Sequence, residues 1–101
     1  MSARPLFHRK ITLLHRRELE LAIAELKIWE VPKSEHYPSG VKFSVFLVSE
    51  TTGEVIIGID NHRPKGPHLH RGKKETPYEF TTSAQLIEDF WALVEREGFE
   101  I

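Results

Sequence analysis

The stretch VKFSVFLVSETTGEVIIGID, residues 41–60, decides the fold of this chain. In its first nine residues, apolar side chains that are largely β-branched or aromatic recur at every second position. This period of two predicts a strand over Val41–Ser49, buried on one face and partly covered on the other. Residues 50–53 form a turn in which Gly53 can take a positive φ, and the alternation resumes over Glu54–Asp60. The whole stretch is therefore predicted to be a β-hairpin.

The two stretches upstream of the hairpin, Leu6–Leu14 and Glu18–Val31, are harder to assign because the second carries helix formers as well as strand formers. As a strand, it would need a bulge near Ala24, where its large apolar residues change face. As a helix, it would gather leucine and isoleucine on one side. We favour a strand, because Lys27–Val31 is rich in β-formers and runs into a proline that opens a loop over Pro32–Gly40.

The C-terminal part of the chain carries the pattern of an amphipathic helix. Thr82 and Gln85 have the spacing of a capping box, and Gly98 is placed to end the helix. Between them, apolar residues recur at helical intervals, namely Leu86, Ile87, Phe90, Trp91 and Val94. We expect this stripe to pack on the sheet as core, so we assign no chemistry to its aromatic residues.

These elements predict an α+β fold: an antiparallel β-sheet of three to four strands with one C-terminal α-helix packed on one face. The chain has 101 residues, 40% of them hydrophobic and 29% charged, which suits one folded domain over residues 1–101. It contains no cysteine, and its apolar runs, such as Val45–Val48, are far too short to cross a bilayer. Residues 1–10 lack the apolar stretch of a signal peptide, so we expect a cytoplasmic protein without a membrane partner.

Charge is unevenly distributed along this sequence. The formal net charge is -1, yet residues 60–74 carry five cations against one anion. The rest of the chain is therefore acidic. A local basic patch on an acidic body attracts an anionic ligand to one place, which is typical of a binding site and not of a protein that coats nucleic acid non-specifically.

The same segment, residues 60–74, holds three of the six histidines. Its prolines and glycines predict a shaped loop rather than a strand or a helix. If the backbone around Leu69 is extended, His68 and His70 project to the same side while Leu69 turns toward the body. Two imidazoles can divide the roles of acid and base near neutral pH, because the unperturbed pKa of histidine lies there.

This residue set predicts a site for the cleavage of RNA, whose 2′-hydroxyl is an internal nucleophile. Acid–base chemistry by two histidines needs neither a metal nor another cofactor, so we expect none. Most residues of the segment then have a candidate role. The catalytic candidates are His68 and His70, with His62 assisting; the phosphate-binding candidates are Arg63, Lys65, Arg71, Lys73 and Lys74; and the residues expected to shape the loop are Asp60, Asn61 and Gly66.

Three other interpretations of the segment stay open. The histidines can be ordinary surface or structural residues of a polar loop. The loop can be a non-catalytic module that grips RNA, DNA or an acidic partner protein. It can also bind zinc, nickel or iron through Asp60, His62, His68 and His70. Against the metal site stand a spacing that matches no standard zinc pattern and the cations nearby, which would repel a metal ion.

Four stretches of the sequence resemble the TumE family of toxins from toxin–antitoxin systems. They are residues 26–32 (LKIWEVP), 55–62 (VIIGIDNH), 65–70 (KGPHLH) and 76–80 (TPYEF), which precede the predicted helix. The resemblance takes in most of the chain beyond its first fifteen or so residues. It implies a small bacterial or archaeal toxin whose partner is an antitoxin with a helix-turn-helix domain. It supplies no catalytic assignment, so the cleavage of RNA is predicted from the chemistry of the segment and by analogy with other small toxins.

Overall fold

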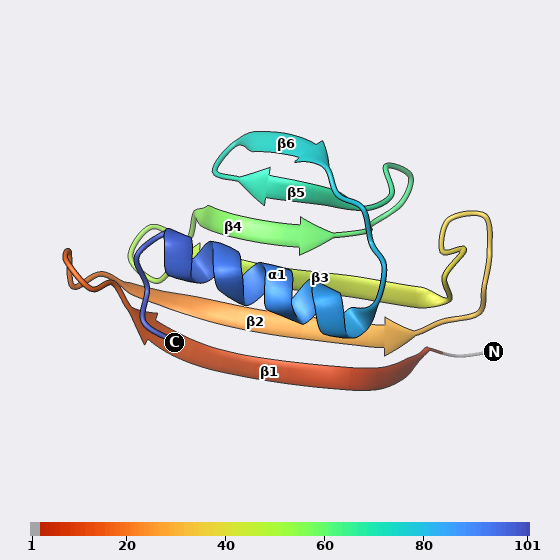
Figure 1. Ribbon diagram of the computed structural model, residues 1–101, viewed down its shortest axis with the longest axis horizontal. Helices are drawn as coiled ribbons and strands as arrows, with labels where there is room; N and C mark the ends of the chain where they lie inside the picture. Colours follow the sequence, from red (N-terminus) through yellow and green to blue (C-terminus); the bar gives the residue numbers. More distant parts are fainter. Residues whose placement is uncertain (1–2) are drawn as a thin grey trace.

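The protein is a six-stranded antiparallel sheet with one helix lying across one face (Figure 1). The computed structural model describes residues 3–101, so the first two residues of the expected domain lie outside the description. The strands follow one another in space in chain order. Their bounds are β1 Arg4–Leu14, β2 Leu21–Glu30, β3 Val41–Ser49, β4 Val55–Asp60, β5 His68–Arg71 and β6 Lys74–Pro77, and the helix α1 spans Ser83–Arg96.

The α+β class, the antiparallel sheet and the C-terminal helix are confirmed, but the predicted number of three to four strands is wrong. Residues 68–77, which lay mostly in the expected loop, form the hairpin of β5 and β6. Each of these strands has four residues and a mostly polar sequence, so neither shows the apolar alternation that marks β3 and β4. They are held by backbone pairing onto the edge of β4, which leaves residues 61–67 as the true loop.

Residues 21–30 form a strand, as expected, but the predicted bulge near Ala24 is absent from β2, which pairs in continuous register with β3. Ala22, Ala24, Leu26 and Ile28 are all buried on one face. Leu21 and Ile23 project to the opposite face, and the two alanines supply the inward positions in the first half of the strand, so the alternation stays regular without a bulge. The irregularity in the pairing of β1 with β2 lies instead between Pro5 and Phe7 of β1.

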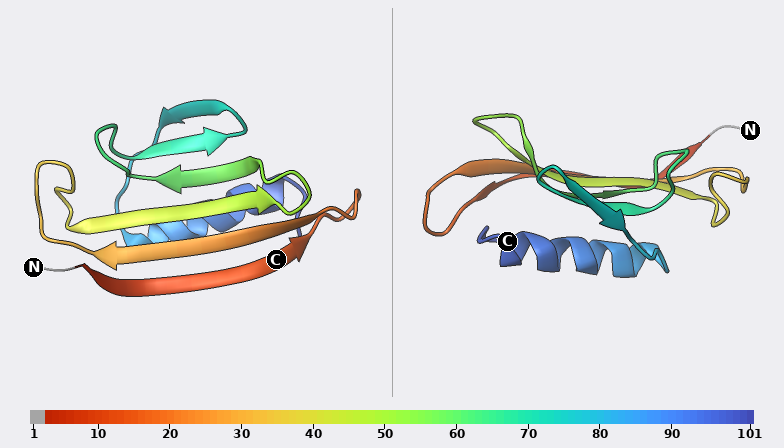
Figure 2. Two further views of the ribbon diagram at one scale, coloured as in Figure 1. Left: turned by 180° about the vertical axis from the view of Figure 1, so that it is seen from behind. Right: turned by 90° about the horizontal axis from the view of Figure 1, so that it is seen from above.

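The hydrophobic core fills the space between α1 and the sheet. Leu86, Phe90 and Val94 of the helix are fully buried against alternate residues of β2, β3 and β4. The predicted start of the helix is confirmed, since the Thr82 hydroxyl accepts a hydrogen bond from the Gln85 amide at 3.1 Å. In the described chain, α1 is the one helix, so the opposite face of the sheet is left bare (Figure 2). Within residues 3–101, no helix has the length and apolar character needed to cross a membrane.

The segment between β6 and α1 is fastened to the helix by Tyr78, whose phenol donates a 2.6 Å hydrogen bond to the Asp89 carboxylate. Burial, together with this hydrogen bond, raises the pKa of the Tyr78 phenol above its usual value of 10.0. Because the pKa of Tyr78 is higher in the folded state than in the unfolded state, the protonated phenol contributes its full stabilisation of the fold at any pH below the unfolded pKa. This contribution is lost as the pH rises from the unfolded pKa toward the folded pKa.

Replacing Tyr78 with phenylalanine is expected to lower the free energy of unfolding by about 1 kcal/mol at pH 7, because the half-buried hydrogen bond to a carboxylate is lost. Urea denaturation measures this change. A second variant, Tyr37→Phe, leaves Tyr78 as the sole tyrosine of the chain. In this variant, phenolate absorbance is expected to rise only at a pH above 10.0. A phenolate step at or below that pH would show that Tyr78 is not held by Asp89.

Candidate functional site

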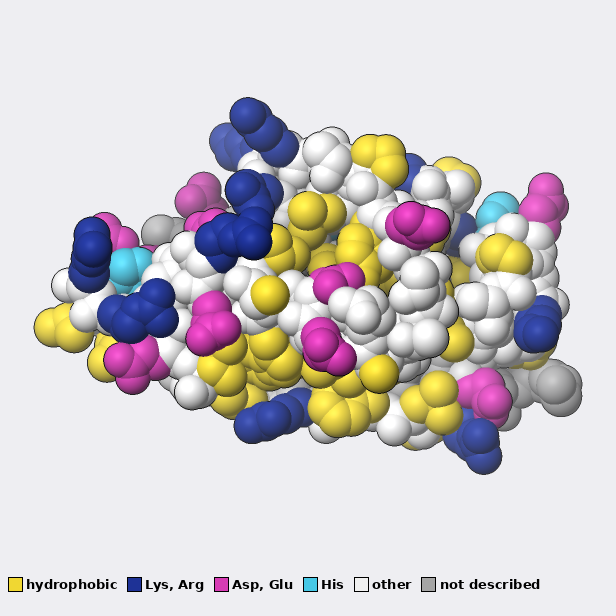
Figure 3. Space-filling view, in the orientation of Figure 1, with side chains coloured by type: hydrophobic (Ala, Val, Ile, Leu, Met, Phe, Trp, Pro, Cys, Tyr) yellow, Lys and Arg dark blue, Asp and Glu magenta, His cyan; other side chains and the backbone are white. Residues whose placement is uncertain are grey.

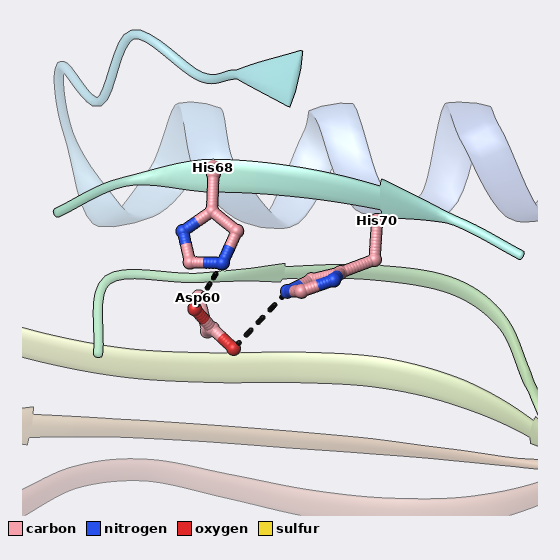
Figure 4. A group of neighbouring side chains, drawn as sticks. All are labelled: Asp60, His68 and His70. Atoms are coloured by element: carbon pink, nitrogen blue, oxygen red, sulfur yellow. Dashed lines mark ion pairs between the residues drawn. The ribbon is translucent and has the colours of Figure 1, made fainter. Parts of the chain in front are cut away.

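A cluster of two imidazoles and a carboxylate lies on the bare face of the sheet, where β4 pairs with β5 (Figure 4). His68 and His70 belong to β5, so their side chains project to the same face, as expected for an extended backbone. Their ring centroids are 4.5 Å apart. Leu69 points to the other face and packs against the core. The two histidines therefore lie side by side on a strand whose opposite face is held against the core by Leu69.

Asp60 lies between the two imidazoles, at the end of β4. The sheet register pairs Asp60 with His68 and Gly58 with His70. Asp60 Oδ1 is 3.5 Å from His68 Nε2, and Asp60 Oδ2 is 3.4 Å from His70 Nε2. All three side chains are largely buried, with exposed fractions of 12% for His68, 19% for His70 and 17% for Asp60. Each carboxylate oxygen thus faces one ring nitrogen in a partly dehydrated setting.

Asp60 is predicted from the sequence mainly to shape the loop. It also makes a hydrogen bond of this kind, since its Oδ1 accepts from the His62 amide at 3.3 Å. Asn61 is a buried structural residue. Its amide oxygen accepts from the Phe43 amide at 2.9 Å, and its amide nitrogen donates to the Val41 carbonyl at 2.7 Å. These bonds fasten the end of β4 to the start of β3 and hold the neighbouring Asp60 in place.

Glu75 is the fourth polar member of this cluster, and no sequence pattern predicted it. It lies on β6 opposite His70, with its Oε1 3.7 Å from His68 Nε2 and its Oε2 3.9 Å from His70 Nδ1. Lys65 donates a 2.9 Å hydrogen bond to Glu75 and thereby lowers the pKa of this carboxyl. Glu75 therefore stays ionised beside the histidines. The signal that could have found it is the register of β5 with β6, which requires recognising both strands.

The hydrogen bonding of each imidazole distinguishes its two nitrogens. His68 Nδ1 lies 2.7 Å from the carbonyl oxygen of Gly66, a residue with a positive φ of 78°. A carbonyl only accepts, so His68 Nδ1 carries the hydrogen and the lone pair of the neutral ring is on Nε2. His70 Nε2 is buried and has no hydrogen-bond partner among residues 3–101. It faces only the Asp60 carboxylate.

A pocket of about 340 Å³ opens beside the cluster, between β5 and the loop 61–67. His62, Arg63 and Lys65 line it together with His68 and His70. The structure therefore brings all three predicted catalytic histidines and two of the five predicted phosphate-binding cations to one pocket.

The other three predicted cations, Arg71, Lys73 and Lys74, do not line this pocket. Arg71 pairs with the core residue Ile57 on one side and with Lys74 on the other, so Arg71 and Lys74 project to the helix side of the sheet. Lys73 lies in the turn between β5 and β6. On that side, dark blue Lys and Arg side chains gather near the turn (Figure 3). A single loop was expected to bring all five cations together. Because residues 68–77 form strands, the alternation of side chains divides the cations between the two faces of the sheet.

The geometry allows two kinds of chemistry. Two adjacent imidazoles with a carboxylate between them can remove and deliver protons, and Arg63 and Lys65 line the same pocket with positive charge that suits an anion. The same three side chains, Asp60, His68 and His70, each offer one metal-ligating atom, and these atoms lie within 4.8 Å of one another.

Comparison with known proteins identifies the family of this chain. No curated protein and no solved structure matches it. The sequence model of the family described as Toxin TumE matches residues 7–97, which is most of the chain. The match includes every strand from β2 to β6, the helix and the whole Asp60–His68–His70 cluster, so the resemblance expected from the sequence is confirmed. The chain therefore belongs to the TumE toxin family.

Proposed function

We propose that this protein is a toxin that cleaves RNA by acid–base catalysis without a metal ion. Its family makes it a toxin of a toxin–antitoxin system. The observation that carries the proposal is the Asp60–His68–His70 arrangement, in which each oxygen of one carboxylate faces the ring of a different histidine. A pair of imidazoles held in this way can exchange protons with two oxygens of one phosphodiester.

The reaction uses the two histidines in turn. One imidazole removes the proton of the 2′-hydroxyl, the 2′-oxygen attacks the adjacent phosphorus, and the other imidazole protonates the departing 5′-oxygen. The products are a 2′,3′-cyclic phosphate and a 5′-hydroxyl. The nitrogens left for this work are His68 Nε2 and His70 Nδ1, because His68 Nδ1 bonds the Gly66 carbonyl and His70 Nε2 is buried.

Three further residues support this chemistry. Asp60 stabilises whichever imidazole carries the extra proton, as an orienting carboxylate does beside a catalytic histidine. Arg63 and Lys65 line the pocket and stabilise the negative charge that develops on the phosphoryl oxygens. His62 lines the same pocket and assists in orienting the substrate.

The decisive experiment is to incubate the purified protein with RNA in excess chelator. We expect RNA fragments that end in a 2′,3′-cyclic phosphate, because the 2′-hydroxyl is the nucleophile and no metal is needed. The matched control is a DNA strand of the same sequence, which lacks this hydroxyl and should stay intact. Uncut RNA, or fragments with 3′-hydroxyl ends, would contradict the proposal.

A second candidate is a toxin that binds RNA or a protein without cutting it. The separation of Arg71, Lys73 and Lys74 from the histidine pocket favours it, because these cations form a basic surface that acid–base chemistry does not use. Binding by phosphate contacts alone should weaken steeply as salt concentration rises, and no cleaved product should accumulate.

A toxin of this kind has an antitoxin as its partner in general. We further propose that this antitoxin carries a helix-turn-helix domain and that it presents an acidic surface to the basic hairpin of β5 and β6, or a strand to an edge of the sheet. The pair would act in the cytoplasm, where RNA is available and where a cysteine-free chain needs no oxidising compartment. A helix-turn-helix gene directly beside this one would support the proposed partner.

A further inference from the structure

We infer that Asp60, His68 and His70 form a binding site for a divalent transition-metal ion, with Zn²⁺ the best match. Imidazole nitrogen and carboxylate oxygen are ligands that zinc prefers. Bonds of 2.0–2.1 Å in tetrahedral geometry place neighbouring ligand atoms about 3.3–3.4 Å apart. Asp60 Oδ1 lies 3.5 Å from His68 Nε2 and Asp60 Oδ2 lies 3.4 Å from His70 Nε2, so two contacts of the cluster have nearly this spacing (Figure 4). One ligand atom from each of the three residues lies within 4.8 Å of the others.

The hydrogen bonds around His68 prepare it for metal binding. A zinc-ligating histidine usually donates its other ring N–H to a carbonyl or a carboxylate, which fixes the ring and its tautomer. His68 Nδ1 makes this bond with the Gly66 carbonyl at 2.7 Å and leaves the lone pair on Nε2, beside Asp60. For His70, the carboxylate of Glu75 lies 3.9 Å from Nδ1 and favours the hydrogen on that nitrogen. Both rings are thus biased to offer Nε2 to one point.

His70 Nε2 supplies an independent observation. It is buried, and no group of residues 3–101 forms a hydrogen bond with it. A buried polar atom without a partner is unfavourable, because it has lost its hydrogen bonds to water and gained none in the protein. A metal ion held between Asp60 and the two rings would coordinate this nitrogen and remove the penalty.

The charge around the cluster also suits a cation. Two carboxylates, Asp60 and Glu75, lie within 4 Å of the imidazoles, and Lys65 is paired with Glu75. Arg71 and Lys74, which seemed from the sequence to repel a metal, project to the other face of the sheet. The irregular sequence spacing is no obstacle either, because the ligands come from two paired strands and not from a single loop.

Three protein ligands leave one position of a tetrahedral zinc ion open, which is typical of sites that exchange water or substrate. The pocket lined by Arg63 and Lys65 is also lined by the three candidate ligands, so it can admit a phosphate beside the ion. Zinc would also occupy His68 Nε2, one of the two nitrogens proposed to transfer protons. If the proposed function holds, on which this consequence rests, zinc inhibits RNA cleavage.

The test is calorimetric titration of tag-free, chelator-treated protein with zinc sulfate. We expect one Zn²⁺ per chain, and we expect affinity to fall on the order of 100-fold or more in His70→Ala and in Asp60→Asn, since each removes a ligand. The matched control is His36→Ala, which removes an imidazole from the exposed surface and should bind zinc like the unchanged protein. Cobalt in place of zinc should give the strong visible absorption of a four-coordinate ion.

The outcomes separate this inference from the proposed function. Absence of zinc binding, or binding that is equal in His70→Ala and in His36→Ala, would overturn the metal site. RNA cleavage is then assayed in chelator and with added zinc. Binding of zinc by a protein that never cuts RNA would support the metal site while removing the proposed function. Cleavage that requires zinc would support the site and remove only the metal-free mechanism.

Discussion

Replacing His70 with alanine is expected to slow RNA cleavage by about 10²–10⁴-fold, the contribution of a single general acid or base. His68→Ala should have an effect of the same size, because the reaction needs a proton removed from one oxygen and a proton delivered to another. The two residues act as a unit, so the double variant should be little slower than either single variant. Single-turnover cleavage of end-labelled RNA in chelator measures these rates.

The design distinguishes a catalytic loss from unfolding. His68 and His70 lie on the face that α1 leaves bare and outside the hydrophobic core (Figure 4), so we expect the melting temperature to be nearly unchanged. His36→Ala removes one imidazole from an exposed loop and should cut RNA at the rate of the unchanged protein. Expression in a sensitive host extends the test to toxicity. A folded double variant that still inhibits growth would remove both histidines from the mechanism.

The parts of the fold that were predictable are those whose sequence pattern reports burial. Residues 41–60 show the strict alternation of a hairpin that is buried on one face, and α1 combines a capping threonine with an apolar stripe. β5 and β6 have no such pattern, because only Leu69 of this hairpin packs against the core. Their pairing depends on the free edge of β4, which is a property of the assembled sheet and not of residues 68–77.

The candidate site was predictable to the extent that it is local. His68 and His70 are two residues apart, so an extended backbone alone brings them together. Asp60 and Glu75 join them through the registers of β4 with β5 and of β5 with β6, and a shift of either register by one residue would move these carboxylates to the other face. Single-sequence reasoning fixes neither register, so Asp60 joined the two histidines only in the metal-site interpretation and Glu75 was not found.

Gly58 links the sheet to the site, and its replacement by alanine is expected to lower the free energy of unfolding by about 2–3 kcal/mol. Gly58 pairs with Phe46 on β3 and with His70 on β5. A Cβ added at Gly58 would lie 2.2 Å from the Phe46 ring, which is closer than any real contact. The ring must therefore leave the place it occupies above the glycine, 5.4 Å from the His70 ring. Urea denaturation measures the loss.

We expect this loss of stability because the Phe46 ring leaves no room for a Cβ at Gly58, and not because the backbone there requires glycine. A double-mutant cycle distinguishes these two causes. In Phe46→Ala the ring that blocks the new Cβ is gone, so adding Gly58→Ala to this variant should cause almost no further loss of stability, giving a coupling energy of about 2–3 kcal/mol. An equal loss in both backgrounds would mean that the strand itself requires glycine there. The absence of a side chain at Gly58 would then have no part in seating Phe46 beside the catalytic candidate His70.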